Sequence, residues 1–126
     1  MKRRSARCPA EMTLNLIGGR WKILLLWQLF QGTKRFSELT RALNGITQKM
    51  LTQQLREMER DGLIHRNVYP QVPPRVEYSL TPIGSSLKPV VDAMCRWGVK
   101  YGSGKLGRWP APPTAAAAVH RRPDAA

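Results

Sequence analysis

The sequence predicts a mainly α-helical domain that carries one small β-hairpin. Through most of residues 8–101, apolar side chains recur at spacings of three and four, which is the period of a helix with one buried face. Between residues 64 and 80 the spacing shortens to two, as it does in paired strands. The chain also has a formal net charge of +13, with 21 lysines and arginines against 8 acids. An excess of this size indicates an anionic partner, such as nucleic acid or an acidic membrane surface.

A chain of 126 residues is long enough for one domain with tails. We expect a basic arm at residues 1–7, a folded domain at 8–101 and a disordered tail at 102–126, because the tail is rich in Gly, Pro and Ala without a period. Neither an apolar signal core nor a span of about 20 apolar residues is present. We therefore expect a cytoplasmic protein that does not contact membranes.

Residues that carry enzyme or metal chemistry are sparse. The two cysteines, Cys8 and Cys95, and the two histidines, His65 and His120, do not form a zinc-binding pattern. The sequence shows no nucleophile–base pair, no paired carboxylates and no phosphate-binding loop. We expect a protein that is not an enzyme and that holds no metal and no cofactor.

Two helices are expected at the amino-terminal end of the domain. Pro9 suits the first turn of a helix that extends to about residue 17, where Gly18-Gly19 ends the apolar pattern. Residues 20–30 are apolar nearly all round, and a helix of that kind is buried on most sides. We interpret this second segment as the central core helix.

Two further helical patterns, separated by a short break, occupy residues 36–62. The break is Asn44-Gly45-Ile46, in which Gly45 permits the left-handed backbone of a helix end. Thr47 can cap the second helix, because its hydroxyl can accept a hydrogen bond from an early backbone N–H. Two helices joined by three or four residues that include glycine are typical of a helix-turn-helix.

The second of these helices has an apolar side and a polar side, and the polar side carries no acid as far as residue 56. Gln bonds adenine, Lys and Arg bond guanine or phosphate, and Thr can contact a thymine methyl group. The residues expected at DNA are Ser37, Thr47 and Arg56, together with Gln48, Lys49, Thr52 and Gln53, which are expected at base edges. A polar face that merely solvates a core helix is the alternative.

A hairpin with a stiff tip is predicted after the second helix. Its two strands are separated by residues 69–74, which contain three prolines and do not suit a strand interior. Arg66 and Arg75 lie near the tip, and a hairpin in this position is a wing whose cations reach phosphates or the adjacent minor groove. The alternative is a structural hairpin whose arginines are merely solvated.

The last predicted helix begins at Thr81-Pro82, a cap followed by a proline in the first turn. Its apolar residues alternate at spacings of four and three, which is a heptad seam. Pro89 within the seam should kink the helix or leave one carbonyl without a hydrogen bond. We expect the seam to meet a second copy of the chain. The expected interface residues are Leu14, Ile17, Leu87, Val90, Met94 and Trp97. Packing of the seam on the domain's own core is the alternative.

Four stretches of the sequence carry a family resemblance: LIGGRWKILLLWQL at 16–29, RFSELTRAL at 35–43, GITQKMLTQQLREMERDGLIHR at 45–66 and YPQVPPRVEYSLTPIG at 69–84. They resemble the HxlR-type winged helix-turn-helix family, which is related in fold to the MarR proteins. The resemblance implies a bacterial transcription regulator that binds double-stranded DNA as a homodimer, built mainly from its first and last helices. It also implies that residues 47–60 form the DNA-reading helix and that residues 67–77 form the wing.

A thiol switch is an open alternative. Cys8 matches an amino-terminal family position that some members use to sense oxidants, quinones or aldehydes, whereas other members have no demonstrated effector. The resemblance therefore leaves open a small-molecule or oxidant effector and does not identify it. Arg3, Arg4 and Arg7 lie close by in sequence, and cations favour the reactive thiolate. A bridge from Cys8 to Cys95 between subunits is conceivable, and two inert cysteines are the alternative. A winged helix that binds proteins instead of DNA is less favoured, because it would need no basic reading face.

Overall fold

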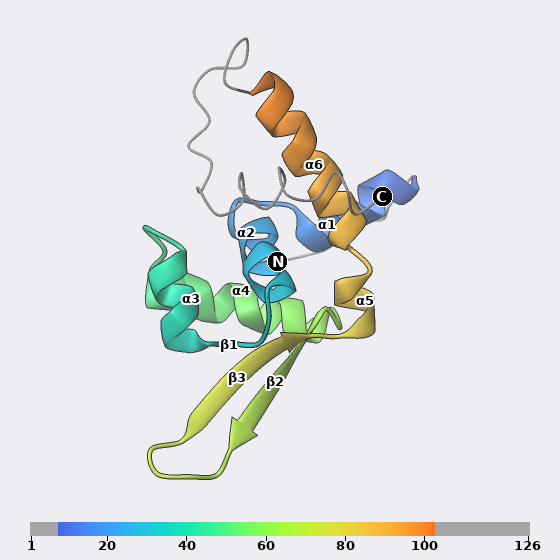
Figure 1. The fold of residues 1–126 in the computed structure, drawn as a ribbon. Coiled ribbons are helices and arrows are strands. Elements are labelled where there is room, and N and C mark those ends of the chain that lie inside the picture. Colours follow the sequence, from blue (N-terminus) through green and yellow to red (C-terminus); the bar gives the residue numbers. More distant parts are fainter. Residues whose placement is uncertain (1–7, 103–126) are drawn as a thin grey trace. The chain divides into compact units, whose positions relative to one another are not determined.

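The computed structural model describes residues 8–102, so the expected arm at 1–7 and the tail from residue 103 lie outside the described residues. The chain divides into two compact units, and the division falls between Ser86 and Leu87. The first unit contains the helix-turn-helix and the hairpin, whereas the second contains the last helix (Figure 1).

The first unit opens with α1, Pro9–Ile17, and α2, Trp21–Phe30. Pro9 occupies the first turn of α1, where its missing N–H interrupts no helical hydrogen bond. Gly19 lies between the two helices with a φ of +93°, a conformation that suits glycine. Leu25 and Leu26 have no exposed surface, so α2 is the core helix that its apolar sequence predicts.

The helix-turn-helix is formed by α3, Phe36–Ala42, and α4, Gln48–Arg60. Gly45 in the turn has a φ of +92°, as the sequence predicts. The hydroxyl oxygen of Thr47 accepts a hydrogen bond of 3.0 Å from the backbone N–H of Met50, so the predicted cap of α4 is confirmed.

The sheet has three antiparallel strands in the order β1-β3-β2. Strands β2, Ile64–Tyr69, and β3, Arg75–Leu80, form the predicted hairpin, which projects away from the helices of the first unit (Figure 1). Strand β1, Lys34–Arg35, pairs with the other edge of β3 and was not predicted, because two residues show no alternating pattern. Strand β1 thereby connects the amino-terminal end of α3 to the wing.

The prediction of one continuous last helix from Thr81 to Tyr101 is wrong. The structure has a short α5, Pro82–Ser85, at the end of the first unit, and a separate α6, Lys88–Tyr101, in the second unit. Pro89 lies in the first turn of α6, where it interrupts no hydrogen bond and makes no kink. The hydroxyl oxygen of Thr81 accepts from the N–H of Gly84 at 3.0 Å, so the predicted cap is confirmed for α5.

The core of the first unit lies where the helices meet the sheet. Helix α2 contacts α3, α4 and β3, which places it at the centre. The apolar side of α4 faces the interior, and its three buried residues are Leu51, Leu55 and Met58. Burying a side chain of this size stabilises a fold by about 1.5–3 kcal/mol. The apolar side of α4 is therefore held against the core, and the opposite side of the helix stays accessible to a ligand.

Candidate nucleic-acid interface

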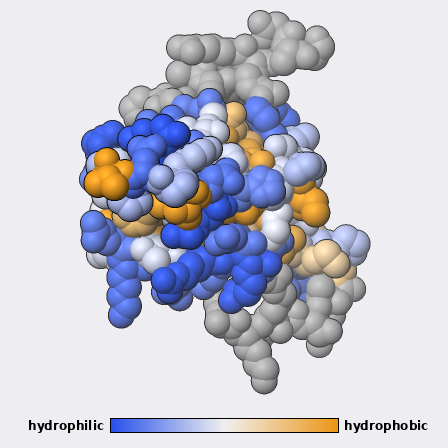
Figure 2. All heavy atoms as spheres, turned by 90° about the horizontal axis from the view of Figure 1, so that it is seen from below, coloured by the Kyte–Doolittle hydropathy of each residue, from blue (hydrophilic) through white to orange (hydrophobic). Residues whose placement is uncertain are grey.

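The outer side of α4 is polar and open to solvent. Lys49, Gln53, Arg56 and Arg60 are all exposed, and their spacing places them along one stripe opposite the buried side of the helix. Hydrophilic residues also dominate the described surface on the side of the molecule seen in Figure 2, where apolar residues form separate spots. An exposed cationic helix face of this length fits a groove of double-stranded DNA.

The structure exposes Ser37, Thr47, Gln48, Lys49, Gln53, Arg56 and Arg66, and it leaves Thr52 and Arg75 half-buried. Helix α4 and the adjacent wing therefore bring together most of the residues expected at DNA. Ser37 lies apart on α3, and the hydroxyl of Thr47 is already engaged as the helix cap.

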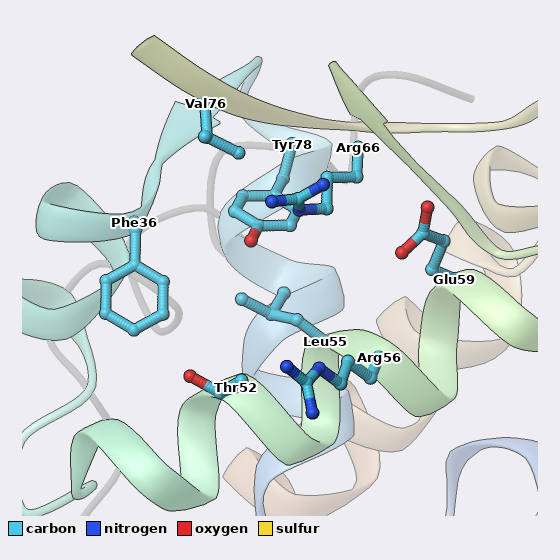
Figure 3. A pocket seen from close by; sticks show the side chains of 8 residues that line it. All are labelled: Phe36, Thr52, Leu55, Arg56, Glu59, Arg66, Val76 and Tyr78. Atoms are coloured by element: carbon cyan, nitrogen blue, oxygen red, sulfur yellow. The ribbon is translucent and has the colours of Figure 1, made fainter. Parts of the chain in front are cut away.

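A hollow of about 460 Å³ lies between α4 and the wing. Arg56 of α4 and Arg66 of β2 line it, with the apolar side chains of Phe36 and Leu55 beside them (Figure 3). Within residues 8–102, neither arginine forms an ion pair with a carboxylate. Two guanidinium groups that form no ion pair, beside an apolar wall, are suited to hold an anionic group such as a backbone phosphate.

The lining of this hollow is completed by Thr52, Glu59, Val76 and Tyr78. Arg66 lies opposite Tyr78 in the ladder of β2 and β3, so the register of the hairpin positions the arginine beside α4. This connection between the wing and α4 depends on strand register, which the sequence alone did not specify.

Arg75, the other wing arginine, is engaged inside the hairpin. Its guanidinium lies 4.4 Å from the centre of the Tyr69 ring, and its Nε lies 3.4 Å from Oε2 of Glu77. The ion pair is partly exposed and contributes at most about 1 kcal/mol, but it offsets much of the charge that Arg75 could present to DNA. Arg66 is thus the more available of the two wing cations.

A part-buried ion pair connects the core helix α2 to α4, and sequence reasoning missed it. The ammonium group of Lys22, in α2, donates a hydrogen bond of 2.5 Å to Oε1 of Glu57. This hydrogen bond holds the pKa of Glu57 below its usual value. In the sequence Lys22 is only a polar interruption of an apolar helix, and a partner 35 residues away leaves no local signal.

Helix α6 carries an outward apolar stripe. The expected interface residues Val90, Met94 and Trp97 are 40%, 44% and 56% exposed, and the Trp97 and Tyr101 rings lie 5.1 Å apart. On α1, Leu14 is 60% exposed.

Two of the expected interface residues are less accessible. Leu87 is half-buried in the single chain. Ile17 is only 1% exposed, because it is part of the core, and it leaves almost no surface for a partner.

The two cysteines have different surroundings. Cys8 is exposed at the cap position of α1, whereas Cys95 of α6 is half-buried. Burial, with a smaller contribution from Asp92, raises the pKa of the Cys95 thiol, so less of it is the reactive thiolate. Of the two, Cys95 is thereby poorly suited to initiate thiol chemistry.

Residues 8–102 contain neither a metal-binding cluster nor a membrane-spanning helix. No cluster there has three His, Cys, Asp or Glu side chains placed to bind a metal ion. In the same part of the chain, no helix combines the length and apolar character that crossing a membrane requires.

Comparison with known proteins matches residues 16–105 to the HxlR-like helix-turn-helix family. The HTH-type transcriptional regulator YdeP of Bacillus subtilis (strain 168) is 60% identical over 94 residues, which are 75% of this chain and 73% of YdeP. Among solved structures, the redox regulator HypR in its oxidized form is 55% identical with a TM-score of 0.70, covering 74% of this chain and 96% of HypR. In its reduced form HypR is 54% identical with a TM-score of 0.72, covering 74% of this chain and 92% of HypR. This chain belongs to the HxlR-like helix-turn-helix family of transcriptional regulators.

Proposed function

We propose that this regulator binds double-stranded DNA as a homodimer at a two-fold symmetric operator. The observation that carries the proposal is the exposed stripe of α4 beside the hollow that Arg56 and Arg66 line. The stripe offers hydrogen-bonding groups for base edges, and the hollow offers positive charge for the backbone. A helix-turn-helix that only bound proteins would gain nothing from this combination.

Helix α4 enters the major groove in this proposal, with Gln48, Lys49, Thr52 and Gln53 at the base edges. Lys49 suits guanine, whose O6 and N7 both accept hydrogen bonds, and Gln53 suits adenine. Arg56 and Arg66 grip phosphates on the two sides of the hollow. The phosphate contacts set the register of the helix, and the base contacts select the sequence.

The dimer is proposed to form through the apolar stripe of α6, with Leu14 of α1 contributing. Val90, Met94 and Trp97 expose apolar surface in a continuous row, which is unusual for a protein that acts as a monomer. A two-fold dimer places two copies of α4 about one duplex turn apart. The operator should therefore contain half-sites centred roughly 10 bp apart, or at a multiple of that distance.

The experiment that tests this function is selection of bound duplexes from a random pool, followed by measurement of the complex mass. We expect a sequence with dyad symmetry and two chains for each bound duplex. Selected sequences without symmetry, or a complex with one chain, would contradict the homodimer.

A thiol switch is the second candidate, and one observation favours it. Cys8 is exposed at the amino-terminal end of α1, where an oxidant in solution can reach its thiol, and the similar protein HypR is a redox regulator. Operator affinity should be measured before and after diamide treatment, for the natural protein and for Cys8→Ser. We expect diamide to change the affinity of the natural protein only. Equal affinity in all four samples would exclude the switch.

A further inference from the structure

Three side chains form a connected path from the core to the outer side of α4. Lys22 is 8% exposed, and its Nζ donates to Oε1 of Glu57 at 2.5 Å. The other carboxylate oxygen of Glu57, Oε2, accepts a hydrogen bond of 3.4 Å from Nε2 of Gln53, one turn earlier in α4. The path therefore ends on a side chain that the proposed function places at a base edge.

The chemistry of the three groups determines which group donates and which accepts in each hydrogen bond of this path. An ammonium group only donates hydrogen bonds, and an ionised carboxylate only accepts them. Lys22 keeps Glu57 ionised by lowering the pKa of its carboxyl group. Glu57 can then pair only with the NH₂ end of the Gln53 amide. This leaves the carbonyl Oε1 and the second amide N–H of Gln53 for another partner.

We propose that Lys22 and Glu57 are positioning residues that hold the Gln53 amide in the orientation that selects adenine. The major-groove edge of adenine presents one donor, the N6 amino group, beside one acceptor, N7, and the amide of glutamine matches that pair. An amide held in place needs no reorientation when DNA binds, so less free energy is spent on ordering it. The proposal rests on the proposed function, because Gln53 must face a base.

The substitution Glu57→Gln tests the direction of the hydrogen bond between Gln53 and residue 57 without shortening the side chain. The introduced amide would turn its carbonyl oxygen toward Lys22, because the ammonium group needs an acceptor, and its NH₂ group would face Gln53. Two NH₂ groups cannot pair, so the Gln53 amide should turn over and present its donor and acceptor in the wrong order for adenine. Glu59→Gln is the matched control for charge, since it removes the same charge from an exposed position of α4 that is not bonded to Gln53. Glu59 lines the hollow of Arg56 and Arg66, so its replacement can change the affinity for all sequences alike, and the control therefore compares the adenine preference alone.

The three proteins are compared on the operator selected by the natural protein, with the base pair that Gln53 reads changed to each alternative. That base pair is the one at which Gln53→Ala abolishes discrimination. The natural protein and Glu59→Gln should prefer adenine there by roughly tenfold, and Glu57→Gln should lose most of that preference. Replacing this adenine with 7-deazaadenine, which lacks the N7 acceptor, should weaken the natural protein more than Glu57→Gln. A merely structural ion pair would weaken all sequences alike and leave both readouts unchanged.

A second measurement needs only the natural protein and does not depend on the folding of a variant. The side-chain NH₂ resonances of Gln53, identified by their absence in Gln53→Ala, should shift as Glu57 is protonated in a pH titration. Unchanged Gln53 resonances, or retained adenine preference in Glu57→Gln, would overturn the positioning role while leaving the regulator function intact. Failure of the natural protein to select any sequence would instead overturn the proposed function itself and, with it, this inference.

Discussion

The guanidinium of Arg75 lies 4.4 Å from the centre of the Tyr69 ring, directly across the last pair of the β2–β3 ladder. The same arginine pairs with Glu77 on its own strand at 3.4 Å. Arg66 lies in the same hairpin but is exposed at the hollow beside α4. The two wing arginines therefore differ in the positive charge that they offer to DNA, although their sequence positions suggest equal roles.

Replacing the two wing arginines separately should reveal this difference. Arg66→Ala should weaken binding to operator and random DNA alike and reduce the slope of log affinity against log salt by about one unit. Arg75→Ala should reduce the slope by clearly less, because Glu77 already offsets its charge. Titrations at a series of salt concentrations measure both slopes, and Arg96→Ala, at an exposed position of α6, serves as the control. Equal slopes for the two wing variants would contradict the difference.

Lys49 should act at a base and Arg56 at a phosphate. Lys49→Ala should reduce operator affinity by about 1–3 kcal/mol and relax discrimination at one base pair of each half-site. Arg56→Ala should reduce affinity for all sequences. Competition between operator and random duplexes measures both effects. If Lys49→Ala lost affinity equally for the two duplexes, its assignment to a base edge would be wrong.

The apolar stripe of α6 predicts a simple disruption of the dimer. Val90→Glu would place an unpaired carboxylate in a buried interface, which costs several kcal/mol. The protein should become monomeric by light scattering and should bind the operator much more weakly. Arg96→Glu introduces the same acid at an exposed α6 position beside the stripe and should remain dimeric. A fully dimeric Val90→Glu protein would show that the stripe does not form the interface.

The ion pair between Lys22 and Glu57 predicts a dependence of stability on acid. The folded pKa of Glu57 is lowered, so its stabilising contribution is complete above the unfolded value of about 4.3 and is lost as pH falls through the folded value. Glu57→Gln should therefore lower the free energy of unfolding at pH 7. The difference from the natural protein should shrink on acidification. Urea titrations at several pH values test this. A difference in unfolding free energy that stayed constant as the pH fell below the folded pKa of Glu57 would contradict it.

Two glycines should respond in opposite directions to the same added methyl group. At Gly84, a Cβ would lie 2.1 Å from the carbonyl oxygen of Leu63, so Gly84→Ala should destabilise the fold by about 1–3 kcal/mol. At Gly98, inside α6, a Cβ would meet no atom within 4 Å, and Gly98→Ala should be neutral or stabilise by up to about 1 kcal/mol. Thermal unfolding of both variants measures the signs. A loss of stability in Gly98→Ala would indicate that another surface packs there.

The sequence contained enough information for the helix-turn-helix and the wing because their signals are local. Gly45 marks the turn, Thr47 marks the start of α4, and the change of period after Gly62 marks the hairpin. Each of these features depends on neighbours within a few residues. The exposed polar side of α4 follows as well, because its buried side is set by the same short-range spacing.

The features that sequence reasoning missed depend on contacts between distant segments. Pairing of β1 with β3 joins Lys34 to Tyr78, and the ion pair joins Lys22 to Glu57. The break between α5 and α6 was missed because the heptad spacing continues across it. The burial of Ile17 in the single chain was not predicted for a related reason, since an apolar residue at a helix end suits a dimer interface and a core equally well.

The far half of the wing contributes little to the folded core. Along β2 only Ile64 is buried, while the strand from His65 onward is exposed, and Val72 at the tip is 99% exposed. Loop tips with so few buried contacts tolerate replacement and insertion without loss of the fold. The tip of the hairpin is therefore a suitable place to graft new segments. A library varied only there should yield regulators with altered affinity for the DNA that flanks the operator and an unchanged melting temperature.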